Sequence, residues 1–245
     1  MALEDRERTF LAEDPWQSIP WSDAPDSKSY INRFVDIILC VPGIMQDLDC
    51  LQTESAERQR IDHVKEAIKS LSARTLDARL DWETLNPNAA REVVPSVIKP
   101  YSAVDENGDL LFDSVLHYKS LQLCVEMGIY FATVFFLRCF SEAVGDTSHV
   151  DTQTQFSAPR RNPVLQLPHE MPSYRDSAVQ ICRSVEFYLQ SGHGLAGAYF
   201  LLFPLRVAQY AFDYTKDYAI VMWIRRVMKY IGDEYGFSNA LRFAT

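Results

Sequence analysis

The stretch SGHGLAGAYFLLFPLRVAQYAF, residues 191–212, decides the fold class, because its composition admits three different structures. It is apolar from Leu195 to Phe212, a length close to the roughly 20 residues that span a membrane as a helix. Pro204 interrupts this run, and Arg206 follows inside it. The stretch could therefore be a membrane span, the wall of a ligand pocket, or the core of a helical domain.

A second apolar run, Leu121 to Leu137, helps to discriminate between these structures. It is shorter than a typical span and contains Gln122 and Glu126. A charge at the centre of a membrane helix costs roughly 2.5 to 3.5 kcal/mol even on the mildest scale. Both runs carry such a charge, and neither is flanked by a strongly basic segment. We therefore expect two buried central helices and no membrane span.

The glycines and the proline predict how residues 191–212 are divided. Gly192 and Gly194 are expected to separate two helices, because glycine is the weakest helix former after proline. Pro204 fits the first turn of a new helix, where its missing amide proton is not needed. This predicts two helical pieces joined at Phe203–Pro204. Arg206 would lie just after the joint.

Arg206 has three possible environments on the predicted helix. The first is solvent, which its long side chain can reach from a partly buried backbone. The second is an ion pair with an acid such as Asp213 or Glu126, because a buried arginine is rarely unpaired. The third is an anionic ligand. The sequence leaves these alternatives open.

Hydrophobic periodicity predicts further helices in the rest of the chain. The clearest is the segment 55–85, in which Ile61, Val64, Ile68 and Leu71 recur every three or four residues. The other expected helices cover about 29–51 (broken at Val41-Pro42-Gly43), 109–144, 173–190 and 216–234. We therefore predict an all-α fold: a single irregular bundle of about six to eight helices with two long buried central helices.

The predicted domain covers residues 28–245 and contains a long polar loop at 145–172. Residues 1–27 precede it as an acidic arm with three prolines, Trp16 and Trp21. This arm lacks the basic and apolar regions of a signal peptide, so we expect it to be extended and either docked by its tryptophans or flexible. A loop as long as 145–172 is usually either disordered or functional, for example as the cover of a site.

Charge and cysteine usage exclude several classes of function. The formal charge of −9 disfavours non-specific binding of nucleic acid, because a phosphate backbone is repelled. The five cysteines are odd in number and widely separated, which is typical of reduced thiols in an intracellular protein, nuclear or cytoplasmic. The histidines include no pair three or four residues apart, so we expect no metal site. Glycine-rich nucleotide motifs and HExxH are absent from the sequence, and no cofactor is predicted.

Three stretches resemble a known family. They are PW-x-D-x-P followed by YINRFVDIILCVPGIMQDLD, then LHYKSLQLCVEMGIYFATVFFL, then AVQICRSVEFYLQSGHGLAGAYFLLFPLRVAQYAF followed by Trp223, Met228 and Ile231. In this order they resemble the C-terminal half of the regulatory domain of fungal binuclear zinc-cluster transcription factors. The resemblance covers most of residues 15–240.

The resemblance implies an all-α, effector-responsive regulatory module. In the family a DNA-binding zinc cluster with six closely spaced cysteines precedes this module, whereas here the first cysteine is Cys40. We therefore expect no direct nucleic-acid binding through a zinc cluster. The leading hypothesis is a stand-alone regulatory domain, linked to fungal secondary metabolism, that binds a hydrophobic small molecule or another transcription regulator. A homodimer is a further possibility.

The alternative hypothesis is a cofactor-independent enzyme on the same scaffold, such as a cyclase or isomerase. An apolar helical pocket could hold a polyketide or terpenoid intermediate under the loop 145–172, with a few polar groups assisting the reaction. The candidate catalytic residues are His193, Arg206 and Glu126. For either function, the candidate ligand-binding residues are Tyr130, Arg138, Tyr199 and Trp223.

Overall fold

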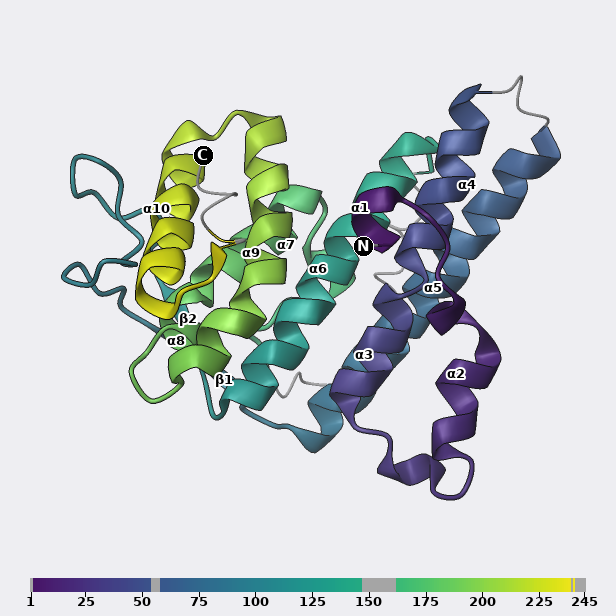
Figure 1. Cartoon of the computed structure of the whole chain (residues 1–245), viewed down its shortest axis with the longest axis horizontal. Coiled ribbons are helices and arrows are strands. Elements are labelled where there is room, and N and C mark those ends of the chain that lie inside the picture. The colour runs from purple at the N-terminus through teal and green to yellow at the C-terminus, as the bar shows by residue number, and fades with distance from the viewer. Residues whose placement is uncertain (1, 54–57, 147–161, 239, 241–245) are drawn as a thin grey trace.

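The protein is a helical bundle built around one central helix. The computed structural model describes residues 2–53, 58–146, 162–238 and 240. In this part of the chain, α6 (Leu121–Ala143) lies in the middle, as Figure 1 shows, with the N-terminal helices on one side and the C-terminal helices on the other. Among the described residues, seven helices have nine or more residues, which confirms the predicted all-α bundle.

The N-terminal side contains three long helices and several short turns. Its elements are α1 (Ala2–Asp5), η1 (Phe10–Ala12), α2 (Asp14–Ser18), η2 (Ile19–Trp21), η3 (Pro25–Ser27), α3 (Tyr30–Ile38), α4 (Val41–Thr53) and α5 (Arg58–Leu85). The break between α3 and α4 falls at Leu39 and Cys40, directly before the predicted Val41-Pro42-Gly43, which forms the first turn of α4, because proline fits the first turn of a helix but not its interior.

The C-terminal side contains four helices and one small sheet; α7, α8 and α9 pack against α6, and α10 packs against α9. Its elements are β1 (Ala90–Val93), β2 (Val115–Tyr118), η5 (Pro168–Glu170), α7 (Tyr174–Arg183), α8 (Val185–Tyr188), α9 (Gly194–Thr215) and α10 (Tyr218–Tyr235). The start of α7 is stabilised as predicted, since the backbone N–H of Ser173 donates to the Asp176 carboxylate over 2.8 Å. Gly192 lies in the turn between α8 and α9, and Gly236 ends α10 with a φ of 75°.

The predicted start of the central helix near residue 109 is wrong. Residues 115–118 instead form β2, which pairs antiparallel with β1 so that Val115 lies opposite Val93 and Tyr118 opposite Ala90. The helix begins at Leu121, where the Ser120 hydroxyl accepts a hydrogen bond from the Leu123 N–H. Pairing with a strand more than 20 residues earlier overrides the local helical pattern.

The predicted joint at Phe203–Pro204 is also wrong, because α9 continues through Pro204. Proline removes one helical hydrogen bond, the one that the Phe200 carbonyl would accept. The side chain of Phe200 is exposed, so water can reach this part of the helix. Pro204 itself is buried, and its ring packs against Gly128 of α6. This packing keeps one helix where the sequence pattern indicated two.

The N-terminal arm is held by arginines rather than by tryptophans. The Arg6 guanidinium pairs with Asp49 over 2.6 Å, and that of Arg8 pairs with Asp47 over 2.9 Å, both on α4. The Gln17 amide donates to the Asp36 carbonyl of α3 over 3.2 Å. Trp16 remains more than half exposed. The arm therefore consists of short helical turns that contact α3 and α4 through polar side chains.

Two helices, α6 and α9, are long and apolar enough to cross a membrane by length and composition. Within the most apolar part of each, 72% of α6 and 56% of α9 is buried inside the domain. Burial against other helices of the same chain accounts for the apolar composition of α6 without a membrane. In contrast, α9 retains one exposed apolar face.

Candidate functional site

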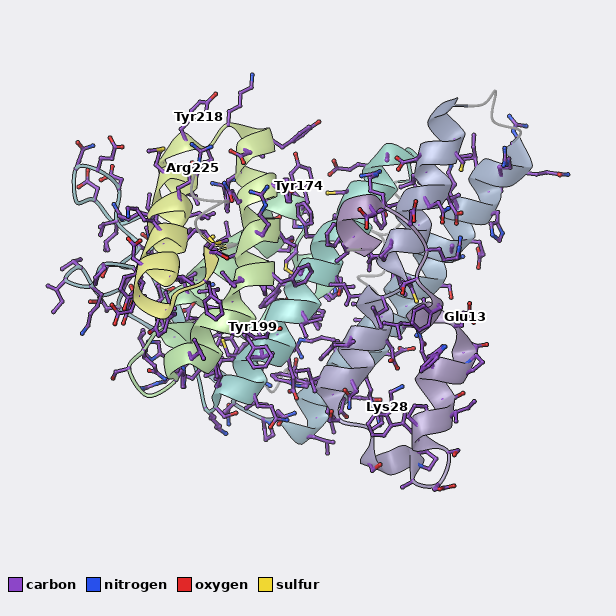
Figure 2. The ribbon with its side chains drawn as sticks, viewed as in Figure 1. Glu13, Lys28, Tyr174, Tyr199, Tyr218 and Arg225 are labelled. Carbon is purple, nitrogen blue, oxygen red and sulfur yellow. The ribbon has the colours of Figure 1, made fainter. Side chains whose placement is uncertain are left out.

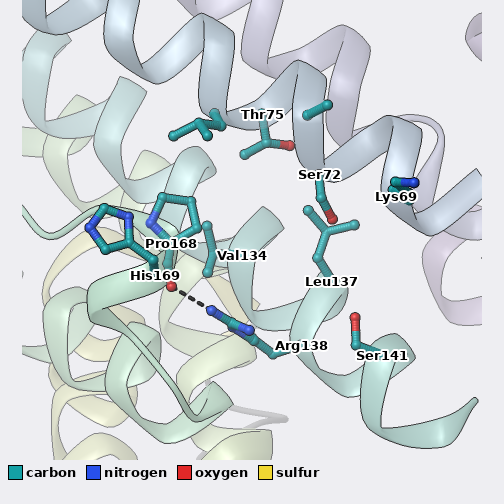
Figure 3. A pocket seen from close by; sticks show the side chains of 11 residues that line it. Lys69, Ser72, Thr75, Val134, Leu137, Arg138, Ser141, Pro168 and His169 are labelled. Atoms are coloured by element: carbon teal, nitrogen blue, oxygen red, sulfur yellow. Dashed lines mark hydrogen bonds between the residues drawn. The ribbon is translucent and has the colours of Figure 1, made fainter. Parts of the chain in front are cut away.

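The candidate site is a cleft between α5 and α6, bounded at one end by η5. It has a volume of about 280 Å³ and is shown in Figure 3. Its lining residues come from three separate segments: Lys69, Ser72, Ala73, Thr75 and Leu76 of α5, Val134, Leu137, Arg138 and Ser141 of α6, and Pro168 and His169 of η5.

The lining combines apolar walls with cationic side chains. Leu76, Val134 and Leu137 supply the walls, and Lys69 and Arg138 supply positive charge. The hydroxyls of Ser72 and Thr75 donate to carbonyls of their own helix, over 2.8 Å and 2.7 Å. Their protons are thus engaged within α5. The charged side chains of Lys69 and Arg138 are therefore the strongest hydrogen-bond donors that the cleft offers to a ligand.

Arg138 is the lining residue whose burial is least explained by contacts within the chain. Its side chain is only 9% exposed, and its Nη2 donates to the Pro168 carbonyl over 2.6 Å (Figure 3). No carboxylate of the described residues lies within ion-pair distance of it. Burial lowers the pKa of Arg138, and the negative charges of Asp176 and Glu142 only partly oppose this effect. A buried guanidinium with one neutral acceptor favours an additional anion.

The segment 162–170, which we call the clasp, closes the inner end of the cleft. It lies across α5 and α6 and is held by hydrogen bonds from both helices. These bonds join the Asn162 N–H to Glu83 (3.0 Å), Arg79 to the Leu165 carbonyl (3.0 Å), the Tyr130 hydroxyl to the Gln166 carbonyl (3.1 Å) and Arg138 to the Pro168 carbonyl. The clasp belongs to the predicted loop 145–172, of which residues 147–161 lie outside the described part.

Two of the predicted residues, Glu126 and Tyr130, meet in a buried polar cluster beside the clasp. The Trp82 indole N–H donates to the Glu126 carboxylate over 2.6 Å, and the Arg79 guanidinium lies over the rings of Trp82 and Tyr130. Arg79 also pairs with Glu83 over 2.8 Å. All five side chains are buried. The cluster joins α5 to α6 and does not open into the cleft.

His193, predicted as a catalytic candidate, lies at the start of α9, away from the cleft. Its Nδ1 is 2.7 Å from the Phe187 carbonyl oxygen, and its Nε2 is 3.0 Å from the Gln190 amide nitrogen. A carbonyl only accepts, so Nδ1 is the protonated nitrogen and Nε2 accepts from Gln190. Both ring nitrogens are thereby used to connect α8 with α9.

The remaining candidates are also distant from the cleft. Tyr199 and Arg206 lie on the exposed side of α9, where Arg206 donates to Gln209 over 2.9 Å and to the Tyr210 hydroxyl over 3.1 Å. Trp223 is buried in α10, and its indole N–H donates to the Ser102 carbonyl over 2.8 Å. Of the seven predicted residues, the structure places only Arg138 in the cleft lining.

Sequence reasoning missed Lys69 and His169 of the cleft. Lys69 lies on the polar side of an amphipathic helix, and His169 lies in a loop, so neither stands out in the sequence. The only available signal was the length of the loop 145–172, which suggested that it covers a site. Across the described residues, His, Cys, Asp and Glu side chains form no group of three that could hold a metal ion.

Comparisons with known proteins give no match: no family model, no curated protein and no solved structure is similar to this chain. The resemblance to the regulatory domain of zinc-cluster transcription factors therefore remains a prediction.

Proposed function

We propose that the domain is a binding module for a small amphipathic anion, which it holds in the cleft between α5 and α6. The observation that carries this proposal is the buried Arg138 at the base of the cleft, which has no ion-pair partner among the described residues. Its guanidinium uses one N–H group for Pro168 and can offer others to a carboxylate. Lys69 at the cleft rim adds a second positive charge.

The size and lining of the cleft restrict the ligand further. Its volume of about 280 Å³ lies at the lower end of the range for small-molecule sites, about 300 to 1,000 Å³. This suits a monocyclic aromatic acid or a medium-chain carboxylic acid better than a folded polyketide or terpenoid. Leu76, Val134 and Leu137 would contact the apolar part, and Arg138 would bind the carboxylate.

This proposal agrees with the predicted role as a stand-alone, effector-responsive regulatory domain linked to fungal secondary metabolism. The clasp provides a physical connection, because Arg138 binds both the proposed ligand and the Pro168 carbonyl. A ligand at Arg138 would thereby change the contacts of a segment that another regulator could recognise. The enzyme hypothesis gains no support from geometry, since His193, Arg206 and Glu126 lie in three separate environments.

Isothermal titration calorimetry with phenylbutyrate and its uncharged analogue phenylbutanol tests the proposal. We expect phenylbutyrate to bind one molecule per chain, at least about tenfold more tightly than phenylbutanol. The reason is that a hydrogen bond to a charged group contributes about 1.5 to 3 kcal/mol. Substitution Arg138→Gln should lower the affinity for phenylbutyrate to that for phenylbutanol and leave phenylbutanol binding unchanged.

Two further variants complete the experiment. Lys69→Gln lies at the exposed rim, so it leaves the core intact and should weaken phenylbutyrate binding by a smaller factor, more so at low salt. Arg91→Gln on β1 removes the same charge from an exposed position outside the cleft and should have no effect. Equal affinity for the acid and the alcohol, or full phenylbutyrate binding by the Arg138→Gln protein, would show that the cleft is not an anion site.

A further inference from the structure

The exposed side of α9 carries a mostly apolar stripe. At 100° per residue, an arc of about 100° on one side of the helix contains Ala196, the exposed Asp213 and six larger side chains, Leu195, Tyr199, Phe203, Arg206, Tyr210 and Tyr214. We call these six residues the α9 stripe. The exposed fractions of its apolar members are 58% for Leu195, 59% for Tyr199, 36% for Phe203, 54% for Tyr210 and 78% for Tyr214.

Such exposure has a cost for an isolated chain, because water in contact with apolar surface is unfavourable. Phe200 adds a further 41% exposed ring beside the stripe. Six side chains of about 200 Å² each, roughly half exposed, give an apolar patch of about 600 Å². Monomeric proteins seldom expose contiguous apolar patches larger than this, and those that do mostly use them for binding.

The order of residues in the stripe points to a specific partner. The spacings between consecutive members are four, four, three, four and four residues, a series that reads the same in both directions. A two-fold symmetric contact between identical helices requires such a series, because residue i of one copy meets residue j of the other and j meets i. An antiparallel pair centred between Pro204 and Leu205 places every member of the stripe opposite another member.

We propose that α9 packs antiparallel against α9 of a second copy of this chain, forming a homodimer. In this register Leu195 lies opposite Tyr214 of the other copy, and Tyr199 lies opposite Tyr210. Phe203 lies opposite Arg206, and each of these pairs occurs twice. Tyrosine and arginine are enriched at the centres of protein interfaces, which agrees with the composition of the stripe.

Contacts within its own chain already hold the Arg206 guanidinium in the orientation that this position requires. Its guanidinium lies 4.3 Å from the centroid of the Tyr210 ring and donates to the Tyr210 hydroxyl. One face of the guanidinium is thus already stacked. The Phe203 ring of a second copy would cover the other face, forming a second cation–π contact in a site from which water is excluded.

The area of the stripe is sufficient for a stable pair. A standard interface covers about 800 Å² of each partner, and the apolar patch of about 600 Å² supplies most of it. Tyr199, labelled in Figure 2, projects from α9 on the side of the bundle that faces the viewer and is 59% exposed, with the Phe237 ring 6.1 Å from its own ring.

Sedimentation velocity of the wild-type protein over micromolar concentrations tests the proposal. We expect a species with twice the chain mass of 28.1 kDa. Substitution Tyr210→Glu places a charge against Tyr199 of the other copy and should weaken dimerisation by at least about tenfold. The matched control is Tyr218→Glu, which changes a tyrosine that is 68% exposed on α10, outside the stripe, and should leave the dimer intact.

The register is tested by a compensating change. Tyr199→Lys alone should weaken the dimer as Tyr210→Glu does, whereas the double variant should recover it through two Lys–Glu pairs across the two-fold axis. Thermal melts check that all variants fold. A wild-type protein that stays monomeric, a Tyr210→Glu protein that stays dimeric, or a double variant that stays monomeric would each overturn the proposal.

Discussion

At the scale of single residues, Tyr188 explains why two helices carry glycines in their interiors. Its hydroxyl donates to the Cys124 carbonyl of α6 over 2.9 Å, and the side chain is almost fully buried. A Cβ at Gly128 would lie 2.3 Å from this hydroxyl, and a Cβ at Gly197 would lie 2.0 Å from the Tyr188 carbonyl oxygen. Both glycines therefore permit α6 and α9 to approach α8 closely.

This close approach makes Gly197→Ala a sensitive test of the packing. In an unhindered helix, alanine would be more stable than glycine by up to about 1 kcal/mol. Here the added methyl group meets the Tyr188 backbone, which cannot rotate away, so α9 has to move. We expect the free energy of unfolding to fall by about 1 to 3 kcal/mol, measured by urea denaturation with circular dichroism.

The control for this substitution is Gly192→Ala in the turn before α9. A Cβ there meets no atom within 4 Å, so the stability should change little. If Gly197→Ala proved as stable as the wild type, α9 would lie farther from Tyr188 than in the structure described here.

At the scale of elements, the sequence predicts which segments are helical better than it predicts where they begin and end. The amphipathic helix predicted at 55–85 is confirmed in the described part by α5. The spacing of its apolar residues follows the side of the helix that is buried, so the pattern is visible in the sequence. The start of α6 was missed because β2 forms its backbone ladder with β1, a partner that local patterns do not reveal. The continuity of α9 was missed because Pro204 is stabilised by Gly128, on another helix.

The boundary between β2 and α6 depends on Ser120, whose hydroxyl accepts from the Leu123 N–H. Removing an N-terminal cap of this kind costs about 0.5 to 2 kcal/mol. We expect Ser120→Ala to lower the free energy of unfolding by about 1 kcal/mol, since α6 contacts helices on both sides of the bundle. Urea denaturation measures the loss.

Ser191→Ala provides the comparison for the cap. Ser191 is an exposed serine in the turn before α9, so its removal should leave the unfolding midpoint unchanged. An equal loss in both variants would mean that the Ser120 hydroxyl has no special role at the start of α6.

At the scale of the whole molecule, the candidate cleft was beyond prediction from sequence for a geometric reason. It forms where three segments meet, around Ser72, Arg138 and Pro168, and these are far apart in the chain. Arg138 was identified because an arginine within an apolar helix needs a partner. The other candidates satisfied the same criterion by contacts that hold the fold, such as Glu126 with Trp82. A polar residue in an apolar helix thus predicts that its side chain has a hydrogen-bonding or ionic partner. Only the fold shows which group that partner is.

The burial of the whole bundle also predicts how its five cysteines react, none of which forms a disulfide within the described residues. Only the thiolate form attacks a disulfide reagent. Cys50 is exposed, whereas burial raises the pKa of Cys124 and Cys182 well above the ordinary range and that of Cys139 to about 12. At pH 8 a thiol with a pKa of 12 is about one ten-thousandth thiolate.

Labelling with dithiobis(nitrobenzoate) at pH 8 should therefore separate these thiols in time. We expect Cys50 to react first and Cys124 and Cys182 to react only as fast as the bundle opens, because both lie beneath packed helices. Addition of urea should merge the phases, and Cys50→Ser should abolish the fast one. Peptide mapping that found Cys124 or Cys182 in the fast phase would show that α6 and α7 separate readily, which contradicts a single continuous core around α6.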